Sequence, residues 1–224
     1  MTTGNITSAI DALSQAIHCN IIPQHEYLLQ GSILDSQVEH LLHRLKGLCD
    51  NVDTGPESFH DHEVCFSLRA PNQATPTLLL RVRKANDVDA PYQLRYIGQQ
   101  EVGDRTRPTL VRNSLDIACT STVVEYLQEL GCRIDFEYTN RGYMFRKGRM
   151  KITVSKIFKM GGIPTKPGES YTEPISQSYL VELSVLAPGT GQDGIGKDMM
   201  QFAEQLKPLV QLEKIDYKRL GNIP

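Results

Sequence analysis

Two glycine-rich phosphate-binding patterns overlap near the end of the 224-residue chain. Residues 189–194 match GxGxxG, and residues 191–198 come close to GxxxxGK[ST]. The dinucleotide pattern needs a βαβ unit, but no strand is readable after the helix that follows. The second pattern needs a Ser or Thr hydroxyl for magnesium, and Asp198 stands there with a carboxylate that would repel phosphate. We therefore interpret the segment as a flexible turn before a helix, with nucleotide binding as an alternative.

Two groups of histidines resemble metal ligands. His40 and His43 are three residues apart on a predicted helix, but no third ligand is suggested nearby. In the run 60–63, His-Asp-His-Glu, a strand would place the histidines on one face and the carboxylates on the other. At most two side chains would then converge. The sequence also lacks a GxSxG elbow, so we predict no catalytic, cofactor or metal site.

Charged side chains recur along the predicted strands: Arg81 with Arg83, Arg133 with Asp135 and Glu137, Lys151, and Glu182. If they faced into a wide barrel, they would line a polyanion tunnel, as in triphosphate tunnel phosphatases, where paired carboxylates hold a divalent metal. Here Glu182 is followed on the same face by Ser184, not by a second carboxylate. Near the start, Glu26 is followed by Leu28 and Gln30. A metal with so few oxygen ligands would bind weakly, so a metal-dependent triphosphatase is the alternative hypothesis.

The clearest structural element is a β-hairpin over 143–159, in which Gly148 separates two alternating arms. A period of two along the second arm predicts a strand with one buried side. Its apolar face carries Met150, Ile152, Val154 and Phe158. A second clear strand is predicted over 178–186, after a loop rich in Pro and Gly.

Further strands and helices follow from the same patterns. Alternation predicts strands over 25–33, 63–69, 78–84, 93–97, 110–118 and 132–138, with Val64, Phe66 and Leu68 pointing inward. Helical spacing and capping boxes, Ser36 with Glu39 and Thr122 with Glu125, predict helices over 36–49 and 122–130. A last helix is expected from Met199 to Val210, kinked at Pro208.

These elements predict an α+β, mainly β, fold. The strands do not alternate regularly with helices, so a parallel sheet is not expected, and a long antiparallel sheet normally closes to remove its edges. We predict a closed or nearly closed antiparallel β-barrel of about eight strands with flanking helices. We expect a single domain over 1–224, with an N-terminal arm (1–24), the barrel and helices (25–212) and a charged tail (213–224).

Composition narrows the function classes. A net charge of −2 gives no global field for nucleic acid, and no apolar run approaches a membrane span. The five cysteines lack CxxC spacing, which favours free thiols in a reducing compartment. No secretory signal is visible at the N-terminus.

Several long blocks resemble the Mediator complex subunit 18 family. They lie in order between about Glu26 and Leu220, and comprise residues 26–32, 42–51, 94–99, 110–113, 145–152, 178–185 and 202–210. The resemblance implies a nuclear, non-enzymatic subunit of the Mediator head module. It implies an antiparallel β-barrel similar to that of tunnel phosphatases but without their activity.

The resemblance also implies partners. Family members pair with Mediator subunit 20, take a C-terminal helix of subunit 8, contact other head-module subunits and act indirectly on RNA polymerase II initiation. No motif transfers a partner contact residue by residue. From the apolar pattern alone, the candidate partner-binding residues are Ile6, Ile10 and Leu13 in the arm, and Leu209, Val210 and Leu212 beyond Pro208. The alternative is that these side chains pack on their own barrel.

Overall fold

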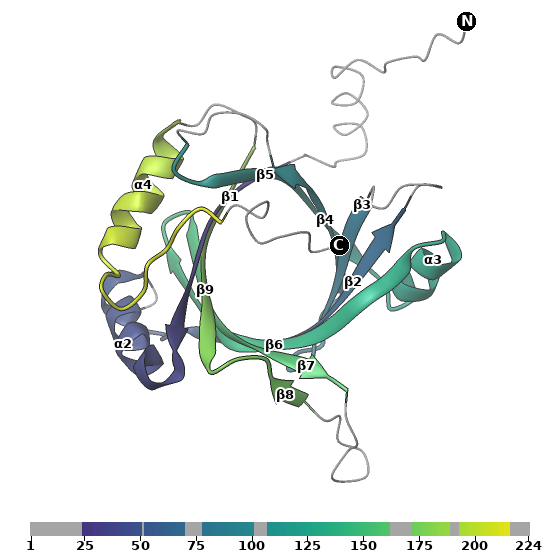
Figure 1. The fold of residues 1–224 in the computed structure, drawn as a ribbon, viewed down its shortest axis with the longest axis horizontal. Helices are drawn as coiled ribbons and strands as arrows, with labels where there is room; N and C mark the ends of the chain where they lie inside the picture. The colour runs from purple at the N-terminus through teal and green to yellow at the C-terminus, as the bar shows by residue number, and fades with distance from the viewer. Residues whose placement is uncertain are drawn as a thin grey trace, which may run out of the picture.

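Eight antiparallel strands close into a barrel, as predicted (Figure 1). The computed structural model describes residues 24–50, 52–69, 78–100, 107–161, 172–188 and 193–215. Around the barrel the strand order is β6-β2-β3-β4-β5-β1-β9-β7, and β7 pairs again with β6 to complete the ring. The short β8 adds to the far end of β7.

The elements have the following bounds. The strands are β1 (Gln24–Leu34), β2 (Glu57–Leu68), β3 (Leu78–Ala85), β4 (Tyr92–Gln100), β5 (Leu110–Cys119), β6 (Arg133–Lys147), β7 (Met150–Met160), β8 (Thr172–Pro174) and β9 (Ser178–Pro188). The helices are the 3₁₀ turn η1 (Asp35–Gln37), α2 (Val38–Leu48), α3 (Val123–Glu129) and α4 (Asp193–Glu204).

The predicted hairpin is formed by β6 and β7. Their register ends with Lys147 opposite Met150, and Gly148 in the turn has a φ of 54°, which a side chain would strain. A residue from another part of the chain fixes this turn, because the backbone N–H of Gly148 donates to a carboxylate oxygen of Asp50 at 2.6 Å. This contact ties the hairpin to the residues just after α2.

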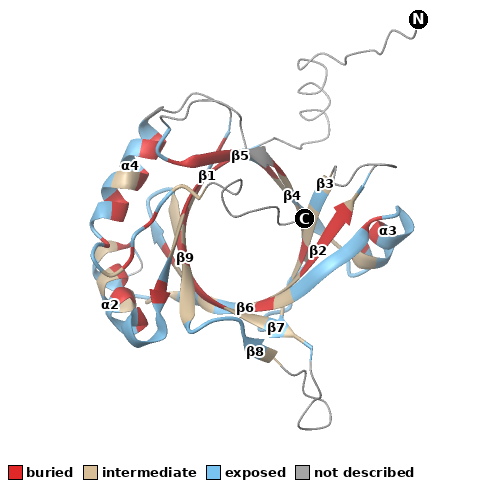
Figure 2. Ribbon diagram, viewed as in Figure 1, coloured by how far each residue is buried: buried red, intermediate tan, exposed pale blue. Residues whose placement is uncertain are grey.

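The apolar face of the wall points outward, beneath the helices, on the side of α2 and α4. We call this cluster the α2–α4 core. Figure 2 shows buried positions on both helices. Its buried members are Tyr27, Leu29, Ile33, Val38, Leu41, Leu45, Cys49, Val111, Phe145, Ile152, Val154, Val181, Leu183, Val185, Ala187, Ile195, Met199, Phe202, Ala203, Leu206, Val210 and Leu212.

A smaller cluster, the α3 core, lies on the opposite side of the barrel between the wall and α3 (Figure 1). Its buried members are Val64, Phe66, Val82, Val123, Leu127 and Cys132. The prediction that Val64, Phe66 and Leu68 point inward is therefore wrong in direction, because they face α3 and leave the lumen to the alternate residues of β2. A period of two separates two faces but does not say which face lines the lumen.

The helices follow the predicted apolar faces, and α3 also has the predicted ends, because it runs from Thr122 as N-cap to Leu130 as C-cap. Gln37, not Ser36, precedes α2, and neither α2 nor α3 has a side-chain cap hydrogen bond, so the two capping boxes are wrong. The reason at α2 is the turn η1, which delays the helix start. The last helix ends at Glu204 and is followed by turns, so it does not continue through Pro208 as a kinked helix.

The chain returns to β1 after α4. Gln30 and Glu213 exchange backbone hydrogen bonds of 2.9 Å in both directions, where β1 has run beyond its pairing with β5. Gly31 permits this approach, because a Cβ there would lie 2.3 Å from the carbonyl oxygen of Gln211. We call residues 209–213 the C-terminal strap. In the part of the chain that the structure describes, no helix is long and apolar enough to cross a membrane.

Candidate functional site: the polar lumen

The inner face of the wall is mainly polar, because side chains alternate along each strand and most of the apolar set lies outside. One group surrounds Glu26 of β1, whose side chain is 6% exposed. Arg112 of β5 donates from Nε to Glu26 Oε2 at 2.6 Å, and Arg95 of β4 lies 3.8 Å from Oε1. Arg95 also pairs through two bonds of 2.6 Å with Asp116. These four residues from neighbouring strands form the Glu26 network.

A second group surrounds Glu63 of β2. The Tyr138 hydroxyl of β6 donates to Glu63 Oε2 at 2.7 Å, and Arg81 of β3 lies 3.9 Å from the same oxygen. Two residues further along each strand, Arg83 of β3 lies 3.5 Å from Asp61 of β2. Burial and then the Glu63 carboxylate raise the pKa of Tyr138, so its phenol keeps the proton that it donates.

The two sides of the lumen also interact with each other. Burial opposes the charge of Arg81, but Tyr138, Glu63 and Glu182 together raise its pKa above the ordinary value. Because β3 and β9 lie on opposite sides of the closed strand order, Glu182 acts on Arg81 across the lumen. The Glu182 carboxylate is itself held by Gln30, whose Nε2 donates to it at 2.7 Å.

The lumen disfavours isolated charges of either sign. Burial raises the pKa of Asp61 above its ordinary value despite the opposing charge of Arg83. Burial likewise lowers the pKa of Lys151, and the like charges of Arg83 and Arg95 lower it further. Burial thus shifts both groups toward their neutral forms. The neighbouring arginines stay accessible, because the side chains of Arg81 and Arg83 are 42% and 33% exposed.

The acidic and basic groups described so far are equal in number. The groups described above comprise five carboxylates, Glu26, Asp61, Glu63, Asp116 and Glu182, and five cations, Arg81, Arg83, Arg95, Arg112 and Lys151. A polyanion tunnel needs surplus cations, and a divalent metal needs clustered carboxylates that are free to bind it. Among the described residues, no group of three or more His, Cys, Asp or Glu side chains could hold a metal ion.

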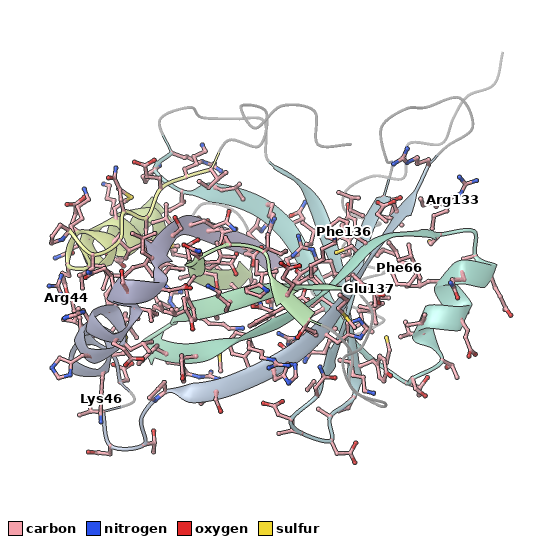
Figure 3. All side chains as sticks on the ribbon, turned by 60° about the horizontal axis from the view of Figure 1, so that its bottom comes forward. Arg44, Lys46, Phe66, Arg133, Phe136 and Glu137 are labelled. Carbon is pink, nitrogen blue, oxygen red and sulfur yellow. The ribbon has the colours of Figure 1, made fainter. Side chains whose placement is uncertain are left out.

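The predicted charged rows divide into two. Arg81, Arg83, Lys151 and Glu182 do face the lumen, whereas the row over 133–137 is interrupted by an irregularity opposite Cys65 and Phe66. Asp135 accepts a hydrogen bond of 2.7 Å from Ser67. Glu137 pairs with His62 at 3.0 Å, and Figure 3 shows it with Arg133 and Phe136 at the α3 end of the molecule.

The histidine groups are not brought together. His60 and His62 lie on the face of β2 away from Asp61 and Glu63, as predicted; His60 accepts from Arg141, and His62 pairs with Glu137. His40 and His43 line a shallow groove of about 460 Å³ on α2, together with Glu39, Arg44 and Leu209.

The glycine-rich segment falls partly outside the described residues, which exclude 189–192. The part that is described forms the start of α4, with Lys197 and Asp198 exposed on it. A Cβ on Gly196 would lie 3.2 Å from the ring of Pro108, so this glycine serves close packing of the helix on the barrel. Every strand pairing of the described sheet is antiparallel, which leaves no βαβ unit.

The candidate partner residues differ in accessibility. Ile6, Ile10 and Leu13 lie outside the described residues. Val210 and Leu212 are buried at 2% and 3% exposure in the α2–α4 core, so in this structure their side chains contact the barrel. Leu209 is partly exposed and lines the groove on α2. Arg44, labelled in Figure 3, holds that groove together by donating to the carbonyl of Lys207 at 2.8 Å.

Sequence reasoning missed most of the lumen partners. Arg95, Arg112, Asp116 and Tyr138 were not identified as site residues, although all occupy alternate positions of predicted strands. The alternation was a usable signal for their common face. Which acid meets which base depends on strand register, and register between distant strands is not readable from one sequence.

The family match and the similar curated proteins all point to one family. Residues 25–221 match the family described as "Med18 protein". "Mediator of RNA polymerase II transcription subunit 18" of Aedes aegypti is 68% identical over 223 residues, covering 100% of this chain and 99% of that protein. The protein of the same name from Drosophila melanogaster is 64% identical over 219 residues, covering 98% and 99%.

A solved structure has the same fold. A chain in the structure of the Schizosaccharomyces pombe Mediator head module aligns with a TM-score of 0.65, covering 85% of this chain and 98% of that one. At 15% identity this match supports the barrel architecture alone. The family match over most of the chain and the two close relatives show more: the chain belongs to the Med18 family, the family of Mediator subunit 18.

Proposed function

We propose that this protein is a non-enzymatic subunit of the Mediator coactivator complex, where it supports RNA polymerase II transcription initiation as a protein-interaction barrel of the head module. Membership of the Med18 family is the observation that carries this proposal. The lumen supports it, because Glu26 and Glu63 are paired with arginines there, and among the described residues no group of three or more possible ligands could hold a metal ion.

We propose pairing with Mediator subunit 20, binding of a C-terminal helix of subunit 8, contacts with other head-module subunits and a nuclear location. Leu209 is the proposed partner residue that stays accessible, on the groove of α2. Ile6, Ile10 and Leu13 remain proposed contacts of the N-terminal arm.

Affinity purification from nuclear extract tests this function. The tagged chain should recover subunits 8 and 20 together with other head-module subunits. Leu209→Asp should reduce recovery of the partner that uses the groove, whereas Val88→Asp, at a residue 61% exposed in the turn between β3 and β4, should not. Recovery of the tagged chain without any Mediator subunit would contradict the proposal.

The enzymatic alternative has its own test. A metal-dependent triphosphatase would release phosphate from a nucleoside triphosphate when Mg²⁺ or Mn²⁺ is added, and Glu182→Ala would abolish the release. We expect no metal-stimulated release from the purified chain. A rate that needs the metal and disappears in Glu182→Ala would replace the scaffold proposal with an enzyme.

A further inference from the structure

A hollow on the outside of the barrel, which we call the Arg141 pocket, has the features of a peptide-binding site. It has a volume of about 350 Å³ and lies on the wall formed by β2, β6, β7 and β9. In Figure 1 this stretch of wall lies between the side covered by α2 and the side covered by α3. Its lining includes His60, Arg141, Tyr143, Lys156, Phe158 and Tyr179.

The guanidinium of Arg141 is held in a defined position. Its Nε donates to His60 Nε2 at 3.0 Å, and its central carbon, Cζ, lies over the ring of Phe158 at 5.2 Å from the centroid. Within the described part of the chain, neither Nη group has a hydrogen-bond partner or a carboxylate within ion-pair distance. These two groups form the edge with which arginine binds a carboxylate through parallel bonds.

His60 is suited to orient this arginine. Burial, and then the charge of Arg141, lowers the pKa of His60 below its ordinary value, against the opposing effect of Asp87. The imidazole is therefore neutral at physiological pH and can accept the Nε–H bond at Nε2. With Nε occupied in this way, the Nη edge is the part of the side chain left for a ligand.

The other charges of the pocket are accounted for. Lys156 is buried, and its Nζ donates to both carboxylate oxygens of Asp35 at 2.5 and 2.6 Å. Its Nζ also lies 5.2 Å from the centroid of the Tyr179 ring, which fixes the position of both side chains at the bottom of the pocket. The charge of Lys156 is thus neutralised by Asp35. Asp87 is exposed at the rim, where water screens it. The cation available to a ligand is Arg141.

Aromatic surface surrounds this cation. The side chains of Tyr143 and Phe158 line the pocket with Tyr179, and Tyr143 is 37% exposed. Phe158 and Tyr179 are partly buried, so the pocket combines accessible aromatic surface with an arginine, which is the composition expected at the centre of a protein-binding patch. The volume is at the lower end of the range for ligand pockets, which suits one or two side chains of a peptide.

We propose that the Arg141 pocket binds an acidic peptide segment of a partner protein. An Asp or Glu carboxylate of that segment takes the Nη edge of Arg141, and a neighbouring apolar side chain lies against Tyr143 and Phe158. Charge and shape alone specify this ligand, whether or not the protein is bound in Mediator.

Fluorescence anisotropy with a labelled probe tests this binding. The probe is a fluorescein-labelled, amidated peptide Asp-Phe-Asp-Leu-Gly-Ser, and its twin has Asn in place of both Asp residues. The full chain should bind the acidic probe at least about tenfold more tightly than the twin, the difference that about 1.4 kcal/mol produces. Equal affinity for the two probes, or no binding of the acidic probe at about 1 mM protein, would overturn the proposal.

Two variants separate the pocket from general electrostatics. Arg141→Gln should weaken the acidic probe at least about tenfold and leave the twin unchanged. Arg133→Gln removes an exposed arginine of the same strand outside the pocket, near the α3 end in Figure 3, and should leave binding unchanged. If both variants weaken binding equally, the probe senses only net charge and the pocket proposal fails.

Location and chemistry are checked by two further measurements. In amide NMR spectra, the acidic probe should shift the signals of Gly142 and Tyr143 more than those of lumen residues such as Ser184. Inorganic phosphate should displace the probe poorly, because it cannot use the aromatic lining. Full displacement by phosphate, or shifts confined to the lumen, would show an anion site of another kind and overturn the proposal. Unchanged melting temperatures verify that both variants are folded.

Discussion

The two covered sides of the barrel differ greatly in depth. The α2–α4 core contains twenty-two buried side chains from two helices, the strap and several strands, whereas the α3 core contains six beneath a helix of seven residues. Between them the polar lumen adds paired charges but little apolar area. Since stability comes mainly from buried apolar surface, the barrel should be held from one side and should open first at α3.

The largest expected difference comes from the same substitution on the two sides. Leu45 of α2 is fully buried, and Leu45→Ala should cost about 4 kcal/mol of unfolding free energy, because a deep core cannot collapse around the cavity. Leu127 of α3 is 3% exposed, and Leu127→Ala should cost about 2 kcal/mol, because a short helix can shift inward. Urea denaturation measures both. Equal losses would break the comparison.

The lumen should contribute less than the deep core but more than surface ion pairs. Glu26→Gln leaves Arg112, whose side chain is 13% exposed, without a counter-charge and should cost about 3 kcal/mol. Glu57→Gln is the matched control, because its pair with Arg146 is 3.4 Å long and more than half exposed on both sides, and it should cost under about 1 kcal/mol. If Glu26→Gln lowers the unfolding free energy no more than Glu57→Gln does, the charge pairs of the lumen do not contribute to stability.

The C-terminal strap contributes Val210 and Leu212 to the α2–α4 core, so its attachment to β1 should also affect stability. Gly31→Ala should cost about 2 kcal/mol, since the new Cβ would collide with the backbone oxygen of Gln211. Gly47→Ala in the last turn of α2 meets nothing within 4 Å and should instead stabilise the protein by about 0.5 kcal/mol, less than the full gain in a helix interior. Thermal melts of both variants decide the point. A strap that tolerates Ala at position 31 would be only loosely attached.

The smallest expected effect on stability comes from the ionisation of buried cysteine thiols. Burial raises the pKa of Cys49 and of Cys65 to about 11, against an ordinary value of 9.0, so both should resist a disulfide reagent at pH 8 while the partly exposed Cys119 reacts. A raised pKa means that the folded state binds more protons between pH 9 and 11. The contribution to stability is therefore present below pH 9 and is lost as the pH rises toward 11. Rapid labelling of Cys49 in the native protein would mean that the deep side opens readily.

The local elements were predictable because their signals are local. Gly148 between two alternating arms predicted the β6–β7 hairpin, and the spacing of Leu41 and Leu45 predicted the buried face of α2. The inward direction assigned to Phe66 was wrong, because alternation is symmetrical and only the position of α3 decides which face is covered. The chain end was also misread, since Pro208 follows turns and not a helix.

The candidate site was predictable in kind but not in pairing. The charged rows through Arg81 and Lys151 indicated a polar lumen, yet the bond from Arg112 to Glu26 joins residues 86 apart and depends on the register of β1 with β5. The Arg141 pocket combines side chains of four strands, and no short pattern contains them. Long-range register is the information that a single sequence does not provide.

The pairing of β1 with β9 has a consequence for how the protein is made. The hydrogen-bonded side chains of Gln30 and Glu182 are 152 residues apart, so β1 leaves the ribosome long before the strand that completes its sheet. During that interval Leu29 and Ile33 are not covered by the strap or by α4. The nascent chain then exposes an unpaired, aggregation-prone strand edge. We therefore expect the first strand to benefit from chaperone protection until the last one emerges.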